Sequence, residues 1–134
     1  MLRCWHNSKG YLIQEQDNCC FVYAAANCSI YRGDWIDEYK LFTACKLLKT
    51  DVQSVVDFLK APLKKTEDEN VVFQKGGIVH LVHPVYNGHP VFILPEEEHV
   101  LLINSWLGPP IIKMEIENVK KHVAKEFGSF WEII

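Results

Sequence analysis

A segment of about twelve residues without any charged side chain, residues 19–30, constrains the fold of this chain more than any other feature. The segment is rich in alanine and follows Asp17 and Asn18, two residue types that commonly cap the start of a helix. A helix that is hydrophobic on every side is stable when the rest of the domain surrounds it. We therefore predict a buried helix over residues 19–30 that ends at the turn formed by residues 32–34.

The composition is that of an ordinary globular domain, because 49% of the 134 residues are apolar and 23% are charged. The net charge of −3 provides no basic surplus for a nucleic-acid partner. No run approaches the ~18 apolar residues of a membrane span, and the first residues do not resemble a secretory signal. We therefore expect a cytoplasmic protein without a nucleic-acid or membrane partner.

Cysteine and histidine spacing argues against a metal site. The five cysteines are unevenly spaced and include no CxxC pair, so neither a disulfide framework nor a structural zinc site is predicted. His80 and His83 are three residues apart in a predicted strand, which places them on opposite faces and disfavours a metal pair. We expect reduced thiols and no cofactor.

Two further helices are predicted in the first half of the chain. One covers residues 35–48, and the other, over residues 52–59, has apolar residues that recur at helical spacing. The side chains expected in the core are Trp35, Ile36, Tyr39, Phe42 and Leu47. Thr50 or Asp51 caps the other helix, over residues 52–59. The charged residues 64–70 are expected to form an exposed loop.

The second half of the chain consists of short β-branched or aliphatic runs separated by turn residues, which is typical of antiparallel hairpins. The predicted strands cover residues 71–73, 78–82, 91–94, 100–103 and 111–116, and a short helix covers residues 117–127. Helices followed by strands indicate an α+β domain in two packed parts. Residues 1–134 then form one domain, with a helical part at about residues 15–62 and a sheet part at about residues 71–116.

The start of the buried helix is a candidate catalytic position. A reactive cysteine needs a stabilised thiolate, a base within reach and donors for an oxyanion. The N–H groups and the dipole at a helix start favour a thiolate, and both Cys19 and Cys20 stand there. The competing interpretation is that these thiols are simply buried packing residues.

A predicted hairpin supplies the base. If its turn is centred between Glu96 and Glu97, the numbers of directly opposed residues sum to 193, which places His89 opposite Asn104. The amide can then hold one imidazole nitrogen and leave the other for the thiolate. A slip of one residue would turn one of these partners to the other face of the sheet.

The order and spacing of these residues resemble the papain-like cysteine peptidases, in which a glutamine, the cysteine, the histidine and an asparagine follow one another. Gln14 lies six residues before Cys20, and Phe21 takes the place of an aromatic residue that often follows the nucleophile. Residues 88–91, Gly-His-Pro-Val, resemble the family's Gly-His-Ala-Val. Residues 104–108, Asn-Ser-Trp-Leu-Gly, resemble its Asn-Ser-Trp-Gly.

The resemblance implies a papain-like α+β fold, in which a buried helix carries the cysteine and packs on an antiparallel sheet that carries the histidine and asparagine. It implies Cys20 as nucleophile, His89 as base, Asn104 as the residue that orients the base, and Gln14 as an oxyanion donor. The motifs are scattered between residues 14 and 108. The short chain is closer to the compact branch of the family, which includes leader-processing peptidases and small viral and bacterial effector proteases.

Two residues rival those assigned to the site. Cys19 is an alternative nucleophile with Gln16 as its matching donor, although the spacing from Gln14 favours Cys20. His99 is an alternative base, but it follows three glutamates at a hairpin tip and is expected to be solvated there.

The predicted reaction is hydrolysis of a peptide or isopeptide bond through a thioester, with a protein or peptide as substrate. Capture of the same thioester by an amine would make the chain a transglutaminase-like acyl transferase. A papain-like fold without activity would make it a binding module.

Overall fold

A computed structural model of the chain describes residues 5–6, 11–13, 19–47, 51–82, 89–103, 111–124 and 130–134. The helices are α1 (Cys20–Tyr31), α2 (Glu38–Leu47), α3 (Val52–Leu59), α4 (Glu69–Lys75) and α5 (Ile116–Lys121). The strands are β1 (Trp5–His6), β2 (Leu12–Ile13), β3 (Leu63–Thr66), β4 (Gly77–Leu81), β5 (His89–Glu96), β6 (His99–Ile103), β7 (Ile111–Glu115) and β8 (Phe130–Ile133). None of these helices combines the length and the apolar character that a membrane crossing requires.

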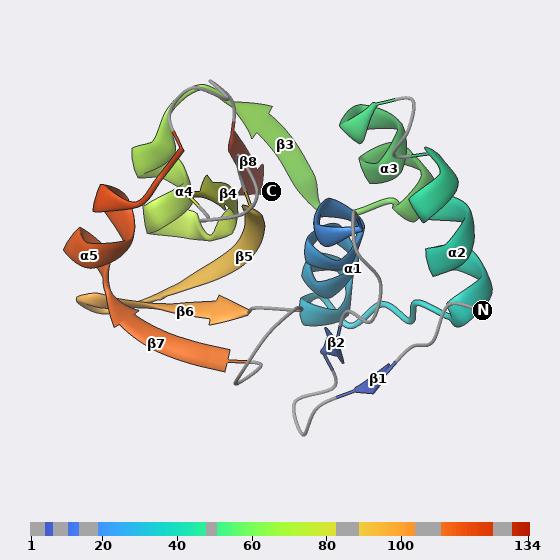
Figure 1. The fold of residues 1–134 in the computed structure, drawn as a ribbon, viewed down its shortest axis with the longest axis horizontal. Coiled ribbons are helices and arrows are strands. Elements are labelled where there is room, and N and C mark those ends of the chain that lie inside the picture. The colour runs from blue at the N-terminus through green and yellow to red at the C-terminus, as the bar shows by residue number, and fades with distance from the viewer. Residues whose placement is uncertain are drawn as a thin grey trace.

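One antiparallel sheet of six strands, in the order β3-β8-β4-β5-β6-β7, forms the middle of the molecule. Helices α1, α2 and α3 lie on one side of it and helices α4 and α5 on the other (Figure 1). Strands β1 and β2 form a separate antiparallel pair next to α1. The α+β fold class that the sequence predicts is thus the observed one.

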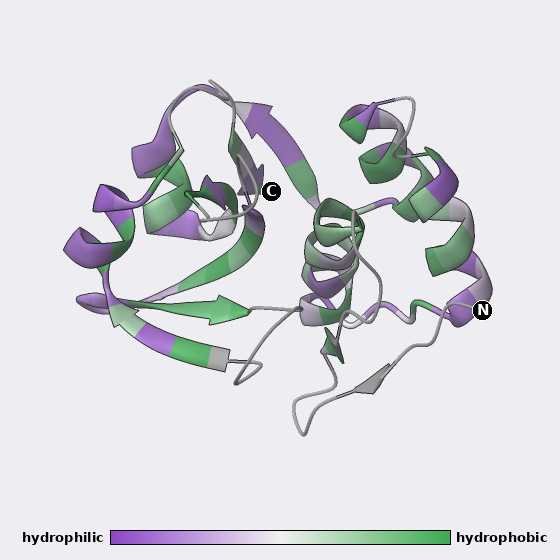
Figure 2. Ribbon diagram, in the orientation of Figure 1, coloured by the Kyte–Doolittle hydropathy of each residue, from purple (hydrophilic) through white to green (hydrophobic). Residues whose placement is uncertain are grey.

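Side chains of the sheet alternate regularly between two hydrophobic clusters. Ile78, Phe92 and Trp131 belong to the cluster that contains α1, whereas their neighbours Val79 and Val91 belong to the cluster under α4 and α5. This alternation is the two-residue period of a pleated strand. The inner strands β5 and β6 are accordingly rich in hydrophobic residues, whereas α5 is largely hydrophilic (Figure 2).

Helix α1 is enclosed on all sides, as predicted. It begins at Cys20, one residue later than predicted, and all nine residues from 21 to 29 are buried. Its end is also as predicted, because Arg32 is the C-cap and Gly33 has a φ of +90°, which favours glycine. The predicted caps, residues 17 and 18, lie outside the described residues.

A buried asparagine attaches β2 to this helix. Asn27 Oδ1 accepts a hydrogen bond from the Leu12 N–H at 2.8 Å, and Asn27 Nδ2 donates to the Leu12 carbonyl oxygen at 3.3 Å. The Asn27 side chain is fully buried. It therefore satisfies two backbone groups of β2 that would otherwise be buried without water.

The core residues predicted for the second helix were largely wrong. Trp35, Tyr39 and Phe42 are 74%, 81% and 43% exposed. The face of α2 that is buried holds Leu41 and Ala44 instead. Both side chains belong to the cluster that contains the alanine-rich α1.

Two other residues of this predicted set do contribute to the core. Ile36 is fully buried, although it precedes the helix, which begins only at Glu38. Leu47 is partly buried and packs against the same cluster as α1.

Helix α3 has the predicted bounds, and the Asp51 carboxylate caps it by accepting from the Ser54 N–H at 2.7 Å. The loop predicted at residues 64–70 was wrong, because this segment contains β3 and the start of α4. The strand predicted at residues 71–73 was wrong as well. This segment is helical because the Asp68 carboxylate caps α4 and because Val72 and Phe73 then reach the sheet from one helix face.

The remaining strands match the prediction more closely. β4, β5, β6 and β7 stand where strands were expected, but α5 ends at Lys121 and not at residue 127. Strand β8 was not predicted, although its Trp131 is fully buried between β3 and β4. The sheet therefore extends beyond the predicted limits of residues 71–116 at both ends.

We predict that Asn27→Ala lowers the free energy of unfolding by roughly 2–5 kcal/mol, because it leaves the buried Leu12 N–H and carbonyl groups without partners. Urea denaturation followed by circular dichroism measures this loss. Asn70→Ala is the matched control, since Asn70 is exposed in α4, and it should change stability by no more than about 0.5 kcal/mol. Equal small losses in both variants would contradict the role given to Asn27.

Candidate active site

Cys20 is the first residue of α1 and its side chain is partly exposed. The first helical hydrogen bond runs from the Tyr23 N–H to the Cys19 carbonyl oxygen at 3.1 Å. The N–H groups of residues 20–22 therefore have no acceptor within the helix. These groups and the helix dipole favour negative charge next to the Cys20 sulfur.

The other described thiols are less suited to attack a substrate. Cys19 is only 7% exposed, and a hydrogen bond from the Cys45 thiol lowers the pKa of Cys19 against the effect of its burial. Cys28 is completely buried, which raises its thiol pKa well above the usual range and keeps it protonated. Accessibility therefore favours Cys20 over the rival Cys19.

Two aromatic contacts define how α1 crosses the sheet. Near its start, the Phe21 ring packs edge-on against Trp131 of β8, with ring centroids 5.7 Å apart. At its end, the Tyr31 ring packs in the same way on Phe92 of β5, at 5.9 Å. The Cys20 end of the helix thus lies over β8, where Trp131 pairs with Ile78 of the neighbouring strand β4.

The predicted base, His89, is the first residue of β5 and is only 8% exposed. Its partner across the ladder is Leu81 of β4. The alternation along β5 places His89 on the same face as Val91, which is the face under α4 and α5. The structure therefore brings His89 to an end of the sheet, but strand alternation directs it to the face opposite α1.

A second histidine follows the same alternation onto the face that α1 covers. His80 of β4 lies two residues after Ile78, which belongs to the α1 cluster. It pairs with Pro90, directly beside the Leu81–His89 pair. The sequence suggests only a metal-binding role for His80. Its spacing of two residues from Ile78 is the signal that indicates this placement.

The two imidazoles influence each other. Burial, and to a smaller extent the charge on a protonated His89, lower the pKa of His80 to about 4. His80 is therefore neutral at physiological pH. A neutral His80 can accept a proton or a hydrogen bond. A thiolate–imidazolium pair, in contrast, needs a histidine that stays protonated at physiological pH.

The register predicted for the histidine–asparagine pair was wrong. The pairs of β5 with β6 run from Phe92↔Ile103 to Glu96↔His99, so opposed residue numbers sum to 195 and not to 193. The turn consists of Glu97, which has a φ of +58°, and Glu98. Pro95 lies within the strand, because only alternate pairs of an antiparallel ladder exchange N–H···O bonds.

On the side of His89, the described register of β5 with β6 stops at the pair Phe92↔Ile103. It therefore does not reach His89 and Asn104. Asn104 and Gln14, like the rival donor Gln16, lie outside the described residues. Their predicted roles as orienting residue and oxyanion donors stay predictions.

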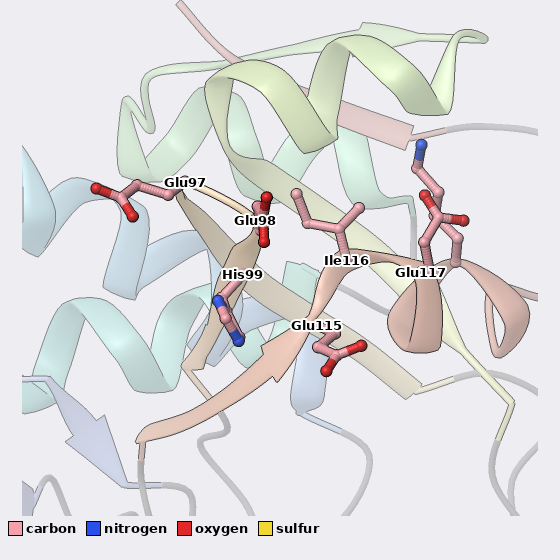
Figure 3. Close-up of a pocket in the computed structure, with 7 residues that line it drawn as sticks. Glu97, Glu98, His99, Glu115, Ile116 and Glu117 are labelled. Carbon is pink, nitrogen blue, oxygen red and sulfur yellow. The ribbon is translucent and has the colours of Figure 1, made fainter.

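The rival base His99 lies far from His89 in the ladder. It is opposite Glu96, at the other end of β5 from His89, and an eight-residue strand is roughly 23 Å long between its terminal residues. His99 lines a separate pocket of about 530 Å³ at the hairpin tip, together with Glu97, Glu98, Glu115, Ile116, Glu117 and Lys120 (Figure 3).

The glutamates of this pocket project from the β5–β6 turn, from the end of β7 and from the start of α5 (Figure 3). Within the residues that the structure describes, no group of three histidine, cysteine, aspartate or glutamate side chains is arranged to hold a metal ion. His83, the second histidine of the predicted pair, lies outside those residues.

Comparisons with known proteins identify a similar fold among solved structures. No protein-family model matches the chain, and the search of curated proteins finds no match. Among solved structures, the chain is similar to the peptidase domain of Streptococcus ComA, described as a bifunctional ABC transporter involved in a quorum-sensing pathway. The TM-score is 0.69 at 11% sequence identity, and the match covers 89% of this chain and 93% of that domain. The chain therefore has the α+β fold of the papain-like type.

We predict that His80 makes the protein less stable in acid. The folded-state pKa of about 4 lies below the unfolded value of about 6.5, so between these values only the unfolded chain gains a proton. The contribution of neutral His80 to the free energy of unfolding is fully present above pH ~6.5. It declines by roughly 3 kcal/mol as the pH falls to 4. Urea denaturation of wild type and His80→Gln at neutral pH and near pH 4.5 measures this loss.

His80→Gln should lose markedly less stability than wild type between the two pH values. His122→Gln is the control, because His122 is exposed at the end of α5 and should behave like wild type. The same acid loss in all three proteins would show that His80 is not buried as a neutral imidazole.

Proposed function

We propose that this chain is a cysteine hydrolase that cleaves peptide or isopeptide bonds through a thioester on Cys20. The observation that carries this proposal is the position of Cys20, partly exposed on the first turn of a buried helix. The fold supports it, because the similar structure is a peptidase domain. The substrate is a protein or peptide.

The chemistry follows from the helix end. The Cys20 thiolate attacks the carbonyl carbon, and the oxyanion is held by the Cys20 backbone N–H and by the Gln14 side chain. An imidazolium protonates the leaving amine, which gives the thioester and the first product. The same imidazole then takes a proton from water, and the resulting attack releases the acid and restores the thiol.

His89 is the proposed base, with Asn104 orienting it, on the order and spacing of the motif. Its place at the start of β5 lets the imidazole approach α1 only around the strand end. His80 is the alternative, supported by its place on the α1 face of β4. Because of its low pKa, His80 would be neutral before the reaction. It would then take the proton of the thiol as the thiol attacks, and no thiolate–imidazolium pair would form beforehand.

We predict that iodoacetamide labels one cysteine much faster than the others near pH 6. A thiol of ordinary pKa is only about 0.3% ionised there, so selective labelling reports a stabilised thiolate. Cys20→Ala should abolish the fast labelling, and Cys19→Ala should keep it. Fast labelling that survives in Cys20→Ala and disappears in Cys19→Ala would transfer the role of nucleophile to Cys19.

The same assay separates the two histidines. If His89 pairs with the thiolate, His89→Gln should slow the labelling of Cys20 at pH 6 by about 10-fold or more, and His80→Gln should change it less than about 3-fold. The reverse order would assign the base to His80. An unchanged rate in both variants would contradict the cysteine–histidine pair, provided that circular dichroism confirms that both variants are folded.

A further inference from the structure

Strand β7 forms one border of the six-stranded sheet (Figure 1). Its inner side pairs with β6 in an antiparallel ladder that runs from His99↔Glu115 to Ile103↔Ile111. Among the strands that the structure describes, none pairs with the outer side of β7. A strand in this position presents a row of backbone N–H and C=O groups to whatever lies beside it.

A hydrogen bond at the end of the ladder shows which backbone groups of β7 point outward. The Ile116 N–H donates to the Glu98 carbonyl oxygen at 3.1 Å, and these two residues continue the register of β6 with β7. Bonded and non-bonded pairs alternate along an antiparallel ladder, so Met114, two residues away, also bonds to β6. The N–H and C=O groups of Lys113 and Glu115 therefore point away from β6.

Pro95 supports the same alternation independently. It has no N–H and lies opposite Val100 in the ladder of β5 with β6. This pair is therefore of the kind that exchanges no bonds, and Val100 directs its N–H and C=O groups to the other side. On that side lies β7, where Val100 is opposite Met114. The two ladders thus agree on the outward groups of β7.

The two faces of β7 carry different side chains. Ile112 and Met114 pack on the cluster under α4 and α5, whereas Lys113 and Glu115 are exposed. The Lys113 ammonium lies 2.9 Å from a carboxylate oxygen of Glu96, which belongs to β5 on the far side of β6. A lysine on an edge strand commonly blocks the addition of a further strand. Here the ion pair draws the ammonium toward β5 and away from the outer side.

Charge around the end of β7 is predominantly negative. Glu115, the last residue of the strand, lines the pocket of about 530 Å³ at the hairpin tip, which His99 also lines (Figure 3). Five glutamates and only two lysines line this pocket or form the neighbouring ion pair: Glu96, Glu97, Glu98, Glu115, Glu117, Lys113 and Lys120. A strand added beside β7 therefore meets an excess of negative charge at this end.

We propose that the outer side of β7 binds an extended, basic segment of a partner protein, which adds to the sheet as an antiparallel strand. The residues of this segment opposite Lys113 and Glu115 exchange backbone hydrogen bonds with them. A basic side chain opposite Glu115, with Cβ atoms roughly 5 Å apart, reaches the carboxylates of the pocket. Apolar side chains alternate with the basic ones and extend the surface of Ile112 and Met114.

A second copy of the chain fits this border less well. Pairing all five residues of two β7 strands around a two-fold axis places Lys113 opposite Lys113, where like charges are destabilising. A shift by two residues relieves this repulsion, but it leaves only three residues of each strand paired. The site does not depend on the proposed function, because β7 carries none of the proposed catalytic residues.

Fluorescence anisotropy of a labelled heptapeptide, Arg-Val-Arg-Val-Thr-Val-Thr, tests the site. Antiparallel addition places its third residue opposite Glu115 and its fifth opposite Lys113. We expect the wild-type protein to bind it with a Kd on the order of 100 µM. N-methylation of the third residue removes an N–H that donates to β7 and should weaken binding by about tenfold or more. N-methylation of the fourth residue, whose N–H points away from β7, should change the Kd by less than about threefold.

Variants of the protein test the same border. Lys113→Pro removes an N–H that β6 does not use, and it should weaken binding by about tenfold. Lys113→Thr keeps this N–H and should stay within about threefold of wild type. Glu115→Gln should weaken binding by about threefold. Glu67→Gln is its matched control, because Glu67 is exposed between β3 and α4, and it should leave the Kd unchanged.

Three results would overturn the proposal: no binding to the wild-type protein up to about 1 mM, equal effects of the two N-methylations, or unchanged binding to a folded Lys113→Pro. If that variant does not fold, the two methylated peptides decide, because they are measured with the wild-type protein. A reversible dimer in sedimentation velocity that the heptapeptide dissociates would also overturn it, because a second copy would then be the occupant of β7.

Discussion

The complete burial of α1 is the constraint on which the rest of the structure depends. A helix without charge on any face needs apolar partners all round, and each neighbour supplies one side. The sheet contributes Ile78, Phe92 and Trp131, and helices α2 and α3 cover the opposite side. The remaining side belongs to β2, where Asn27 satisfies the backbone of Leu12. Because side-chain hydrogen bonds replace water there, β2 can be buried without an energetic penalty for its amide groups.

Enclosure of the helix also determines where chemistry can occur. Only the ends of α1 leave backbone groups without helical partners, and the start carries Cys20 with a partly exposed thiol. The same enclosure explains the different behaviour of three thiols in one helix and its cap. Burial keeps Cys28 protonated, and a hydrogen bond from Cys45 lowers the pKa of the buried Cys19. Cys20 remains partly exposed. Position along one helix thus separates the two buried cysteines from the partly exposed one.

Local patterns in the sequence predicted most elements, and errors arose where tertiary packing decides. The charge-free run and the Asp51 cap specify α1 and α3. Residues 71–73 are β-branched or aromatic, which suits a strand as well as a short helix, and only the Asp68 cap distinguished the two. The exposed aromatic residues of α2 have the same helical spacing as a core face, so the sequence could not tell which face meets α1.

The candidate site shows the same division. The place of Cys20 at the start of α1 could be predicted because a helix start is a local feature. The pairing around His89 could not, because the register depends on a two-residue turn at Glu97 and Glu98 and on Pro95 within β5. The placement of His80 toward α1 follows from alternation in β4, but which face of β4 meets α1 depends on partners far away in the sequence.

The central claim, hydrolysis through Cys20, is tested most directly by incubating the protein with a mixed peptide library in water enriched in ¹⁸O and analysing the products by mass spectrometry. The account predicts cleaved peptides whose new carboxyl ends contain ¹⁸O with the wild-type protein and none with Cys20→Ala. Products joined to an added amine in place of water would identify a transferase. Intact peptides in the presence of wild-type protein whose Cys20 labels rapidly would contradict the assignment as a hydrolase.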